Sequence, residues 1–519
     1  MKLPRIFGRK RIAEERFFMR RLREDIRGST LALVAAAMIP MMGIIGCGVD
    51  MSRSYLAKTR LQQACDAGVL GGRKVMGANG VDATVTAEVQ KFVNYNFPQG
   101  YLGSATFPIN PTAGANNSVN LTLSTTEPTV IMKIFGTNSV PISATCTARQ
   151  DFVNTDVVLV LDTTLSMNCL PSDPSNCYST SEKSGAKIQA LRSAVTAFYN
   201  ALKPAQDELE SQGLRLRYGI VPFSETVNVG QLLRSTNSTW VNATSSYRNC
   251  SNPSPRGSLQ NACTSSAAPS SVTRTAAFWS TWNGCIEERQ TVNTIGASSG
   301  YTPPSSAYDL DVSLVPNSTA TRWNVYDPAN ESARAGYAGI DSACPKAVQQ
   351  IQAVSSVSNM NSFTSSMTAG GYTYLDIGML WGARLLAPNG LWSSNNPSTF
   401  NNFPVNRHLI LFTDGYIEPN TDTYSAYGVE KFDKRVSGNG TLATQTASHT
   451  QRFRMLCNTV KGMNVNVWVV SFGAGSSLTT DLVNCANTPA QAFKADDQTA
   501  LIAKFTEIGE AIGALRLSQ

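Results

Sequence analysis

Residues 157–167 read VVLVLDTTLSM and decide the fold of the larger part of the chain. The unbroken apolar run Val157–Leu161 is typical of a strand that is buried on both faces, as in a parallel sheet. The run ends in Asp162, and hydroxyl side chains follow at every second position, Thr164 and Ser166. Because ligands of parallel sheets lie at the carboxyl ends of the strands, this ending predicts a binding site.

The segments that follow alternate between helical and strand patterns. Residues 187–202 place Ile188, Leu191 and Val195 on one helical face, and residues 216–223 have the composition of a second strand. We expect further helices at 347–367, 375–386, 451–460 and 501–515, and further strands at 409–412 and 465–472. This order predicts an α/β domain over residues 151–519, with a doubly wound, mainly parallel sheet.

An insertion of different composition interrupts this domain at about residues 228–345. Within it, seventeen of the thirty residues 251–280 are Ser, Thr, Asn, Gly or Pro. This composition predicts a loop-rich segment held by cysteines and by aromatic side chains such as Trp279, Trp282 and Trp323. The insertion is either a decoration of the fold or a surface that binds a partner.

Two later segments add oxygen side chains to the expected site. Gly370–Thr373 precedes a predicted helix, and His408–Gly415 ends a buried strand in a carboxylate and a glycine. In a parallel sheet these ends share one edge, so oxygen atoms from three loops should meet there. Such a set of hydroxyls and carboxylates suits Mg²⁺, and its members are Asp162, Thr164, Ser166, Thr373 and Asp414.

The segments DTTLSM, GGYTYLDIG and LILFTDG resemble, in order and spacing, the metal-ion-dependent adhesion site of von Willebrand factor A (vWA) domains. The resemblance assigns Asp162, Thr164 and Ser166 to its first element, Thr373 to its second and Asp414 to its third. Thr164 stands where the family has Ser, which keeps the hydroxyl and adds a methyl group. The resemblance implies a Rossmann-like vWA fold that binds Mg²⁺, or Mn²⁺ or Ca²⁺, and through it an acidic side chain of a partner protein. A vWA domain without metal, acting as a structural tether, is the alternative.

The N-terminus combines a basic tail with an apolar run. Residues 1–27 contain ten Lys and Arg against four Asp and Glu, and residues 28–49 carry no charge. Twenty-two uncharged residues suffice to span a bilayer, and the positive tail predicts a cytoplasmic N-terminus with the rest of the chain outside. The remainder is nearly neutral, with 33 basic and 32 acidic residues, which removes the electrostatic basis for binding nucleic acid.

Three interpretations of the apolar run compete. A retained transmembrane helix is favoured, because no small-x-small cleavage site follows it. A lipoprotein signal would use the sequence Ile44–Cys47 and lipidate Cys47. A prepilin-type leader would need Glu five residues after Gly28, where Leu33 stands.

Residues 50–150 predict a small α+β unit. Residues 50–77 should extend the transmembrane helix, and the alternation in 118–124 and 140–148 predicts a β-hairpin. The basic tail, the Gly-initiated span and VDMSRSYLAKTRLQQACDAGVLGG (49–72) resemble the anchoring segment of TadE/TadG-type proteins of Flp (Tad) pilus assembly. An anchor of this type joined to a vWA domain is the arrangement of the TadG-like family. The resemblance implies a single-pass protein of the bacterial inner membrane, with periplasmic or envelope-facing domains, that acts in tight-adherence pilus assembly or anchoring.

Cysteine usage favours an oxidising compartment. Besides Cys47, the chain has ten cysteines and no Cys-x-x-Cys pair. We expect sequence-local disulfides, with several free buried cysteines as the alternative. The expected pairs are Cys65 with Cys146, Cys169 with Cys177, Cys250 with Cys263, Cys285 with Cys344, and Cys457 with Cys485.

An enzymatic function is a remote alternative. Gly296–Gly300 reads GASSG and fits the Gly-x-Ser-x-Gly form of a hydrolase, with Ser298 as nucleophile and His408 or His449 downstream. That motif needs a buried strand before it and a helix after it, whereas residues 291–295 are short and polar. We therefore expect a binding protein without a small-molecule substrate, not an enzyme.

Overall fold

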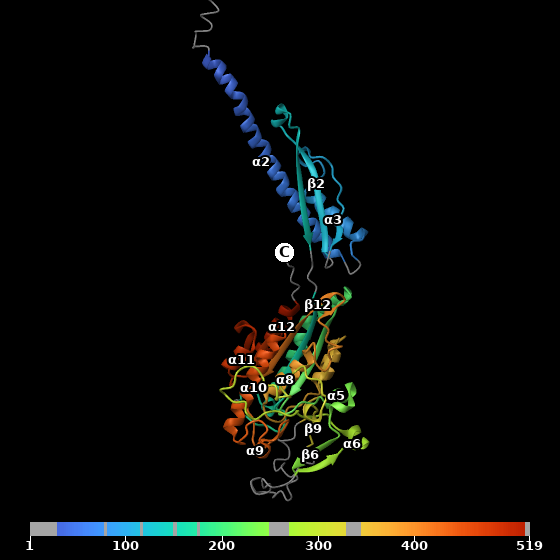
Figure 1. The fold of residues 1–519 in the computed structure, drawn as a ribbon, viewed down its shortest axis with the longest axis vertical. Coiled ribbons are helices and arrows are strands. Elements are labelled where there is room, and N and C mark those ends of the chain that lie inside the picture. The colour runs from blue at the N-terminus through green and yellow to red at the C-terminus, as the bar shows by residue number, and fades with distance from the viewer. Residues whose placement is uncertain are drawn as a thin grey trace, which may run out of the picture. The chain divides into compact units, whose positions relative to one another are not determined.

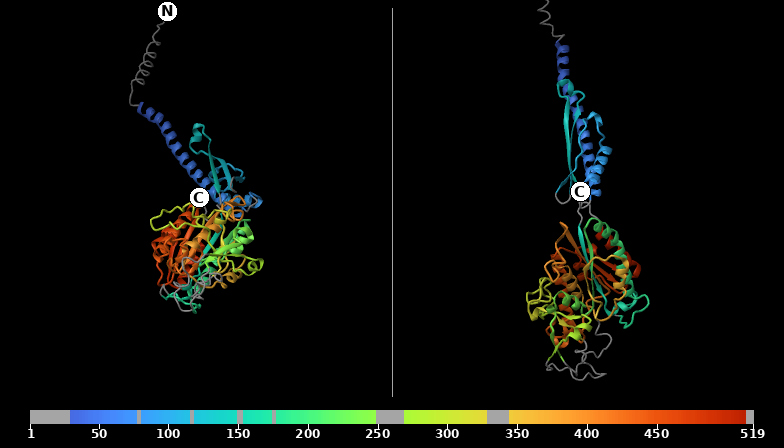
Figure 2. Two further views of the ribbon diagram at one scale, coloured as in Figure 1. Left: turned by 60° about the horizontal axis from the view of Figure 1, so that its bottom comes forward. Right: turned by 90° about the vertical axis from the view of Figure 1, so that its right-hand side faces the viewer.

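The computed structural model describes residues 29–76, 80–114, 118–148, 153–173, 177–248, 269–327 and 344–513. Its contacts divide the chain into two compact units, an N-terminal unit up to Asp151 and a C-terminal unit Phe152–Leu515. Figure 1 and Figure 2 show the ribbon of both units. The predicted basic tail 1–27 lies outside the described residues.

The N-terminal unit packs one long helix against a second helix and a small sheet. The sheet is antiparallel, in the order β1-β2-β3, and strands β2 and β3 form the predicted hairpin. Their side chains alternate between buried and exposed, so one face covers the helices. The elements are α2 (Ser29–Val75), α3 (Ala83–Asn96), the 3₁₀ turn η1 (Tyr101–Gly103), β1 (Thr112–Gly114), β2 (Ser118–Pro128), the 3₁₀ turn η3 (Met132–Phe135) and β3 (Ser139–Ala148).

Helix α2 contains the predicted span and its outward extension in one piece of 47 residues. The helix is long and apolar enough to cross a membrane, and only 6% of its most apolar 18-residue stretch is buried. Its first part exposes large apolar side chains such as Leu33 and Ile44, while Leu61 and Val69 further along are buried against the rest of the unit. The expected N-terminal apolar helix is therefore confirmed.

The C-terminal unit is a mixture of helices and strands around one main sheet, as expected for an α/β domain. Its elements up to the insertion are β4 (Asn154–Asp162), η4 (Leu165–Asn168), α4 (Lys187–Ser211) and β5 (Leu216–Phe223). The later elements are β10 (Gln349–Gln352), α7 (Val357–Thr364), α8 (Leu375–Leu386), β11 (Thr399–Phe400), β12 (Phe403–Thr413), β13 (Tyr424–Ser425), β14 (Gly428–Val429), α9 (Glu430–Asp433), α10 (Leu442–Gly462), β15 (Val465–Phe472), α11 (Thr480–Cys485), η9 (Pro489–Gln491), β16 (Ala492–Ala495) and α12 (Gln498–Gly513).

Strands of the main sheet follow the order β10-β5-β4-β12-β15-β16. The pairs from β5 to β16 are parallel, whereas β10 and the short β11 pair antiparallel with their neighbours. Alternate residues of β4 face two different cores: Val158 and Val160 pack with α8 and α10, and Val157 and Leu159 pack with α4 and α12. Because both faces are covered, all nine residues of β4 are buried.

One predicted helix is wrong. Residues 347–367 form strand β10 and the shorter helix α7 in place of one continuous helix. Gln349 and Gln352 pair with the exposed edge of β5, which supplies backbone hydrogen bonds that a helix at this position could not make. The Ser356 side chain then accepts a hydrogen bond from the amide of Asn359, and this cap begins the helix late.

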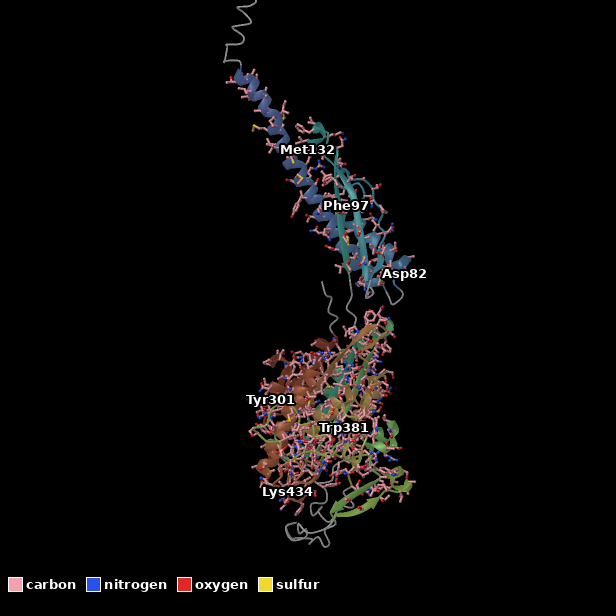
Figure 3. All side chains as sticks on the ribbon, in the orientation of Figure 1. Asp82, Phe97, Met132, Tyr301, Trp381 and Lys434 are labelled. Carbon is pink, nitrogen blue, oxygen red and sulfur yellow. A yellow bond between two sulfur atoms is a disulfide. The ribbon has the colours of Figure 1, made fainter. Side chains whose placement is uncertain are left out.

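The insertion contains short elements that are fixed to the domain core. They are α5 (Gly230–Thr236), η5 (Ser238–Trp240), β6 (Thr244–Arg248), β7 (Pro269–Thr273), α6 (Ala276–Thr281), β8 (Ile286–Glu287), η7 (Thr319–Thr321) and β9 (Asn324–Val325). The buried Glu288 carboxylate accepts hydrogen bonds from Trp323 within the insertion and from Trp381 and Arg384 of α8. Trp381, labelled in Figure 3, is completely buried.

Four of the five expected disulfides are present. They join Cys65 to Cys146, Cys169 to Cys177, Cys285 to Cys344 and Cys457 to Cys485. The fifth expected pair, Cys250 and Cys263, lies outside the described residues. Cys47 is free and exposed on α2.

Candidate oxygen-rich site at the end of the parallel sheet

Two neighbouring strands of the sheet end in carboxylates at the same edge. β4 and β12 run parallel in register, with Leu161 beside Phe412. Asp162 is the last residue of β4, and Asp414 follows the last residue of β12, Thr413. Parallel pairing therefore brings two acidic side chains together although they are far apart in sequence.

The loop Gly370–Thr373 is attached to the loop after β4 by backbone hydrogen bonds. The Gly370 amide donates to the Thr163 carbonyl at 2.9 Å, and the Leu165 amide donates to the Gly371 carbonyl at 3.0 Å. Gly371 has a φ of 80°, and a Cβ at this position would lie 1.7 Å from the Glu225 carboxylate. The Tyr372 amide donates to the same carboxylate, so a glycine is required for this close approach. Thr373 is thereby held beside the first loop.

All five predicted site residues lie in one network of hydrogen bonds. The Thr164 hydroxyl donates to Asp162 Oδ1 at 2.6 Å and lies 3.3 Å from Ser166 Oγ. Ser166 donates to Asp414 Oδ1 at 2.9 Å, and Thr373 donates to Thr164 Oγ1 at 3.2 Å. The structure thus brings together the oxygen atoms that the sequence places on three separate loops.

Burial changes the acidity of one carboxyl group in this network. Asp162 is fully buried, and burial raises its pKa from the ordinary value of 3.8, with a further increase from the Asp414 carboxylate. Hydrogen bonds from Thr164 and Thr413 act in the opposite direction, and the resulting pKa is about 7. Burial first, and then the neighbouring Asp414 carboxylate, thus disfavour a negative charge on Asp162.

Two further residues of the network, Thr413 and Lys187, are not predicted from the sequence. The Thr413 hydroxyl donates to Asp162 Oδ2 at 2.7 Å, and the Lys187 ammonium lies 2.8 Å from Asp414 Oδ2. Lys187 is the first residue of α4 and is 2% exposed. Lys187 lies on the same helical face as Leu191 and Val195, which are buried. This position could have identified it from the sequence, because a buried lysine needs a partner.

The donor set is compatible with a divalent cation. Two carboxylates and three hydroxyls offer oxygen ligands alone, as Mg²⁺ and Ca²⁺ prefer. Ser166 is the half-buried member, whereas Asp162, Thr164, Thr373 and Asp414 are buried. In the arrangement described here Lys187 already supplies one positive charge to Asp414.

Gly415, which directly follows Asp414 in the chain, lines a cavity of about 200 Å³. Leu375 of α8, Phe453 of α10 and the exposed Tyr416 contribute to its lining. Near the same loop, the Tyr178 hydroxyl donates to the Glu418 carboxylate at 2.6 Å. The backbone amide of Glu418 donates to the Thr373 carbonyl. Exposed aromatic and acidic groups therefore flank the network.

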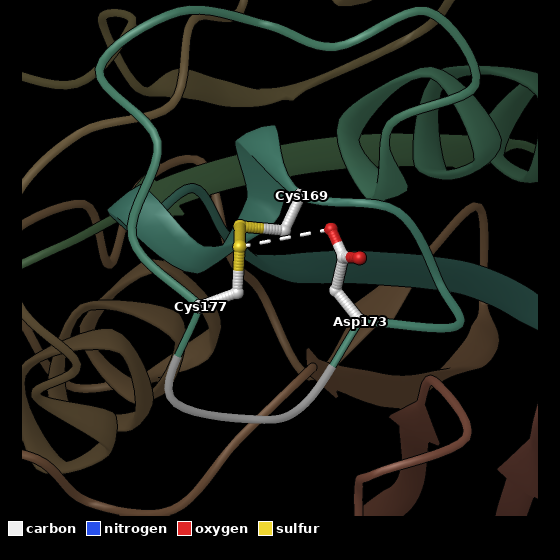
Figure 4. A group of neighbouring side chains, drawn as sticks. All are labelled: Cys169, Asp173 and Cys177. Atoms are coloured by element: carbon white, nitrogen blue, oxygen red, sulfur yellow. Dashed lines mark hydrogen bonds between the residues drawn. A yellow bond between two sulfur atoms is a disulfide. The ribbon is translucent and has the colours of Figure 1, made fainter.

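A second group of potential metal ligands follows the first loop. Ligand atoms of Cys169, Asp173 and Cys177 lie within 4.8 Å of one another (Figure 4). The two sulfur atoms are bonded to each other in a disulfide, and Asp173 pairs with Lys183 at 2.9 Å. Since thiolates are the ligands that such a site would need, this group is a structural crosslink in its oxidised form.

The geometry at the GASSG segment differs from that of a hydrolase. Residues 295–300 form a turn with neither a strand directly before it nor a helix directly after it. The amide of Gly296 donates to the Ser299 hydroxyl, and His449 lies in α10 with its Nδ1 2.7 Å from Asp376 Oδ2. The strand-turn-helix context that the nucleophile motif requires is therefore missing at this described segment.

Comparison by sequence matches one part of the chain to a family. Residues 28–79 match the family described as "Putative Flp pilus-assembly TadE/G-like". The predicted resemblance of the apolar span and its extension to this family is thereby confirmed. No curated protein sequence matches the chain.

Several solved structures are similar to parts of the chain. The pilus adhesin SpaC from Lactobacillus rhamnosus GG is 13% identical, with a TM-score of 0.30, over 78% of this chain and 34% of the adhesin. A von Willebrand factor type A protein from Catenulispora acidiphila is 11% identical, with a TM-score of 0.28, over 79% of this chain and 50% of that protein. The PilB minor pilin from Streptococcus sanguinis is 10% identical, with a TM-score of 0.32, over 78% of this chain and 77% of the pilin. The chain thus spans about a third of the adhesin and half of the Catenulispora protein.

Proposed function

We propose that this chain is a membrane-anchored envelope protein of Flp (tight-adherence) pilus assembly or anchoring. The family match at residues 28–79 supports the link to the pilus, and the long apolar helix α2 supports the anchor. The basic tail at residues 1–27 favours a cytoplasmic N-terminus, with both units on the envelope side of the inner membrane. Disulfides in both units are consistent with an oxidising compartment.

We further propose that the C-terminal unit is a vWA domain that binds a partner protein through a divalent cation. The observation that carries this proposal is the single hydrogen-bonded network formed by Asp162, Thr164, Ser166, Thr373 and Asp414. Mg²⁺ is the preferred ion, because the ligands are all oxygen atoms and three of them are uncharged. Such an ion keeps positive character, and an acidic side chain of the partner can complete its coordination. The proposal is one of binding and not of catalysis.

A second candidate function follows from Lys187. The ammonium group neutralises Asp414 in the absence of metal, so the network can be a purely structural one. The C-terminal unit would then act as a tether that contacts its partners without a cation. The two candidates differ in whether chelators affect partner binding.

Titration of the full-length protein in detergent with Mg²⁺ and Mn²⁺ distinguishes these candidates. We expect binding at one site per chain, loss of that binding in Asp162→Asn, and unchanged binding in Asp173→Asn. Asp173 is the matched control, because it belongs to the neighbouring Cys169 group and pairs with Lys183 outside the network. Equal binding by both variants would reject Asp162 as a ligand, and absence of binding by the wild type would favour the tether.

Crosslinking in intact cells addresses the partner. Under the cation proposal, crosslinks between the C-terminal unit and its partner disappear when a chelator is added or when Asp162 is replaced by Asn. Crosslinks that persist under both conditions support the metal-free tether.

A further inference from the structure

The turn between β2 and β3 carries an exposed apolar surface. We name residues 130–135, VIMKIF, the hairpin tip. Val130 is 56% exposed, Ile134 is 81% exposed and Phe135 is 44% exposed. A cluster of large apolar side chains at a turn marks a contact surface, because turns that face water are normally polar.

The hairpin tip lies against the apolar part of α2. A Cβ at Gly46 would be 2.3 Å from Ile131 Cγ2, and a Cβ at Gly43 would be 3.5 Å from the Phe135 ring. Glycines at these two positions allow the tip to approach the helix backbone. Figure 3 shows Met132 beside α2, at the end of the unit that is remote from Asp82.

The contact with α2 gives the depth of the tip relative to the apolar run. Gly43 and Gly46 lie inside the uncharged residues 28–49, six and three residues, respectively, before the run ends at Val49. At 1.5 Å per residue the contacts lie roughly 5 to 9 Å inside that end. Amphipathic elements that bind membranes reach a depth of about 5–10 Å, between the headgroups and the acyl chains.

Asp50 holds the tip at this position along α2 and pairs backbone amides of the tip that would otherwise be costly to bury in lipid. Its carboxylate accepts hydrogen bonds from the amides of Val130, Ile131 and Met132, at 2.9, 3.0 and 2.7 Å. The amides of Ile134 and Gly136 donate to carbonyls within the turn. Backbone groups without partners are costly in lipid, so a turn whose amides are bonded internally can enter the membrane interface at low cost.

We propose that the hairpin tip inserts into the lipid leaflet that surrounds the outer end of α2, as a second membrane contact. Val130, Ile134 and Phe135 contact the acyl chains, and the exposed Lys133 reaches the anionic phospholipid headgroups. We propose lipid as the binding partner because the tip continues the exposed apolar surface of α2. The anchor assignment already places that surface of α2 in the membrane. This inference rests on that assignment and is independent of the cation site.

Spin labelling of the full-length protein in vesicles of phosphatidylcholine and phosphatidylglycerol tests the proposal. Cys47→Ala removes the one free thiol among the described residues, and Cys250→Ser with Cys263→Ser removes the two cysteines outside them. A nitroxide is then attached to one new cysteine at a time, in Ile134→Cys or Val130→Cys at the tip. Both native side chains are exposed, so the label does not disturb the core. Accessibility to oxygen, which concentrates in lipid, is compared with accessibility to a water-soluble nickel chelate.

Two control positions on the same unit calibrate the result. Leu33→Cys reports the anchor, because Leu33 is 67% exposed within the apolar run. Thr122→Cys reports water, because Thr122 is exposed on β2, eight residues before Val130, or about 26 Å at 3.3 Å per residue. We expect the ratio of oxygen to nickel accessibility at Ile134 to be severalfold higher than at Thr122 and closer to that at Leu33.

Each other outcome overturns the proposal in a distinct way. A ratio at Ile134 equal to that at Thr122 places the tip in water. Low accessibility to both reagents at Ile134 assigns the tip to a protein partner, such as a second copy of this chain. A water-like ratio at Leu33 as well would show that the anchor assignment itself fails.

Discussion

Lys187 Nζ lies 2.8 Å from Asp414 Oδ2, and both side chains are almost completely buried. Lys187 begins α4, and Asp414 directly follows the last residue of β12, so this ion pair joins two elements at the edge of the sheet. Under the cation proposal, an ammonium so close to a candidate ligand carboxylate repels a divalent cation and supplies positive charge when that cation is absent. If the proposed cation binds, this pair should influence both the stability of the network without metal and its affinity for metal.

Replacement of this lysine should tighten metal binding. Lys187→Met keeps most of the unbranched side chain and removes its charge, so we expect roughly tenfold higher affinity for Mg²⁺, or about 1.4 kcal/mol. Calorimetric titration of the full-length protein measures the effect. Lys183→Met is the matched control, because Lys183 is exposed and pairs with Asp173 outside the network. Equal affinities of the wild type and Lys187→Met would show that the ammonium does not oppose the cation.

The same variant should be unstable without metal. Removal of one partner from a buried ion pair costs about 3–5 kcal/mol, because the remaining charge is left without compensation. We expect Mg²⁺ to raise the melting temperature of Lys187→Met more than that of the wild type. A melting temperature that is insensitive to Mg²⁺ in both proteins would support the metal-free tether.

The main strands and the five candidate ligands could be predicted because their signals are local. The apolar runs of β4 and β12 end in Asp162 and Asp414, and the parallel order of such strands brings their ends together. Hydrophobic periodicity gave α8 and β15 their observed bounds, Leu375–Leu386 and Val465–Phe472. Local pairing also gave four disulfides.

The features that could not be predicted depend on contacts between distant residues. Lys187 and Asp414 are 227 residues apart, and no local pattern joins them. Residues 347–367 have a helical composition, but the edge of β5 recruits Gln349 and Gln352 into the sheet. The role of Glu288 depends on Trp381, which belongs to a helix far along the chain.

Removal of the Glu288 carboxylate should destabilise the C-terminal unit strongly. Glu288 Oε1 lies 2.9 Å from the Arg384 guanidinium, and both side chains are completely buried. Glu288→Ala leaves Arg384 without this partner, so we expect the free energy of unfolding to fall by about 3–5 kcal/mol. All seven tryptophans lie in the C-terminal unit, so denaturant titration with tryptophan fluorescence reports on it.

A surface ion pair provides the control for this variant. Glu507 pairs with Lys504 on α12 and is 55% exposed, so Glu507→Ala should cost about 0–1 kcal/mol. Similar effects of the two substitutions would indicate that the insertion is only loosely attached to α8 through Glu288.

The disulfides should stabilise the chain according to the length of the loop that each closes. Cys65 and Cys146 are separated by 81 residues, and Cys169 and Cys177 by 8. Loss of the first, in Cys65→Ser with Cys146→Ser, should cost about 4–5 kcal/mol, and loss of the second about 2–3 kcal/mol. Hydrogen exchange of β2 and β3 measures the first effect, and tryptophan fluorescence measures the second. A larger cost for the shorter loop would show that contacts in the folded state outweigh the entropy of the unfolded chain.

His408 should make the stability of the C-terminal unit sensitive to acid. Burial lowers its pKa from 6.5 to about 4. In the folded state His408 Nδ1 accepts a hydrogen bond from Trp468 Nε1 at 3.3 Å, so this nitrogen must remain unprotonated. Below pH 6.5 the unfolded chain binds a proton at this residue before the folded chain does, and acid therefore favours unfolding.

The resulting loss of stability should occur between about pH 6.5 and pH 4 and should level off at lower pH, where both states are protonated. Its slope is at most about 1.4 kcal/mol per pH unit for one histidine. His408→Gln removes this titration, while the other titratable groups are the same in both proteins. The difference in unfolding free energy between wild type and variant, followed by tryptophan fluorescence, should therefore shift in favour of the variant as the pH falls through this range. A difference that stays constant from pH 7 to pH 4 would mean that His408 titrates alike in the folded and unfolded chains.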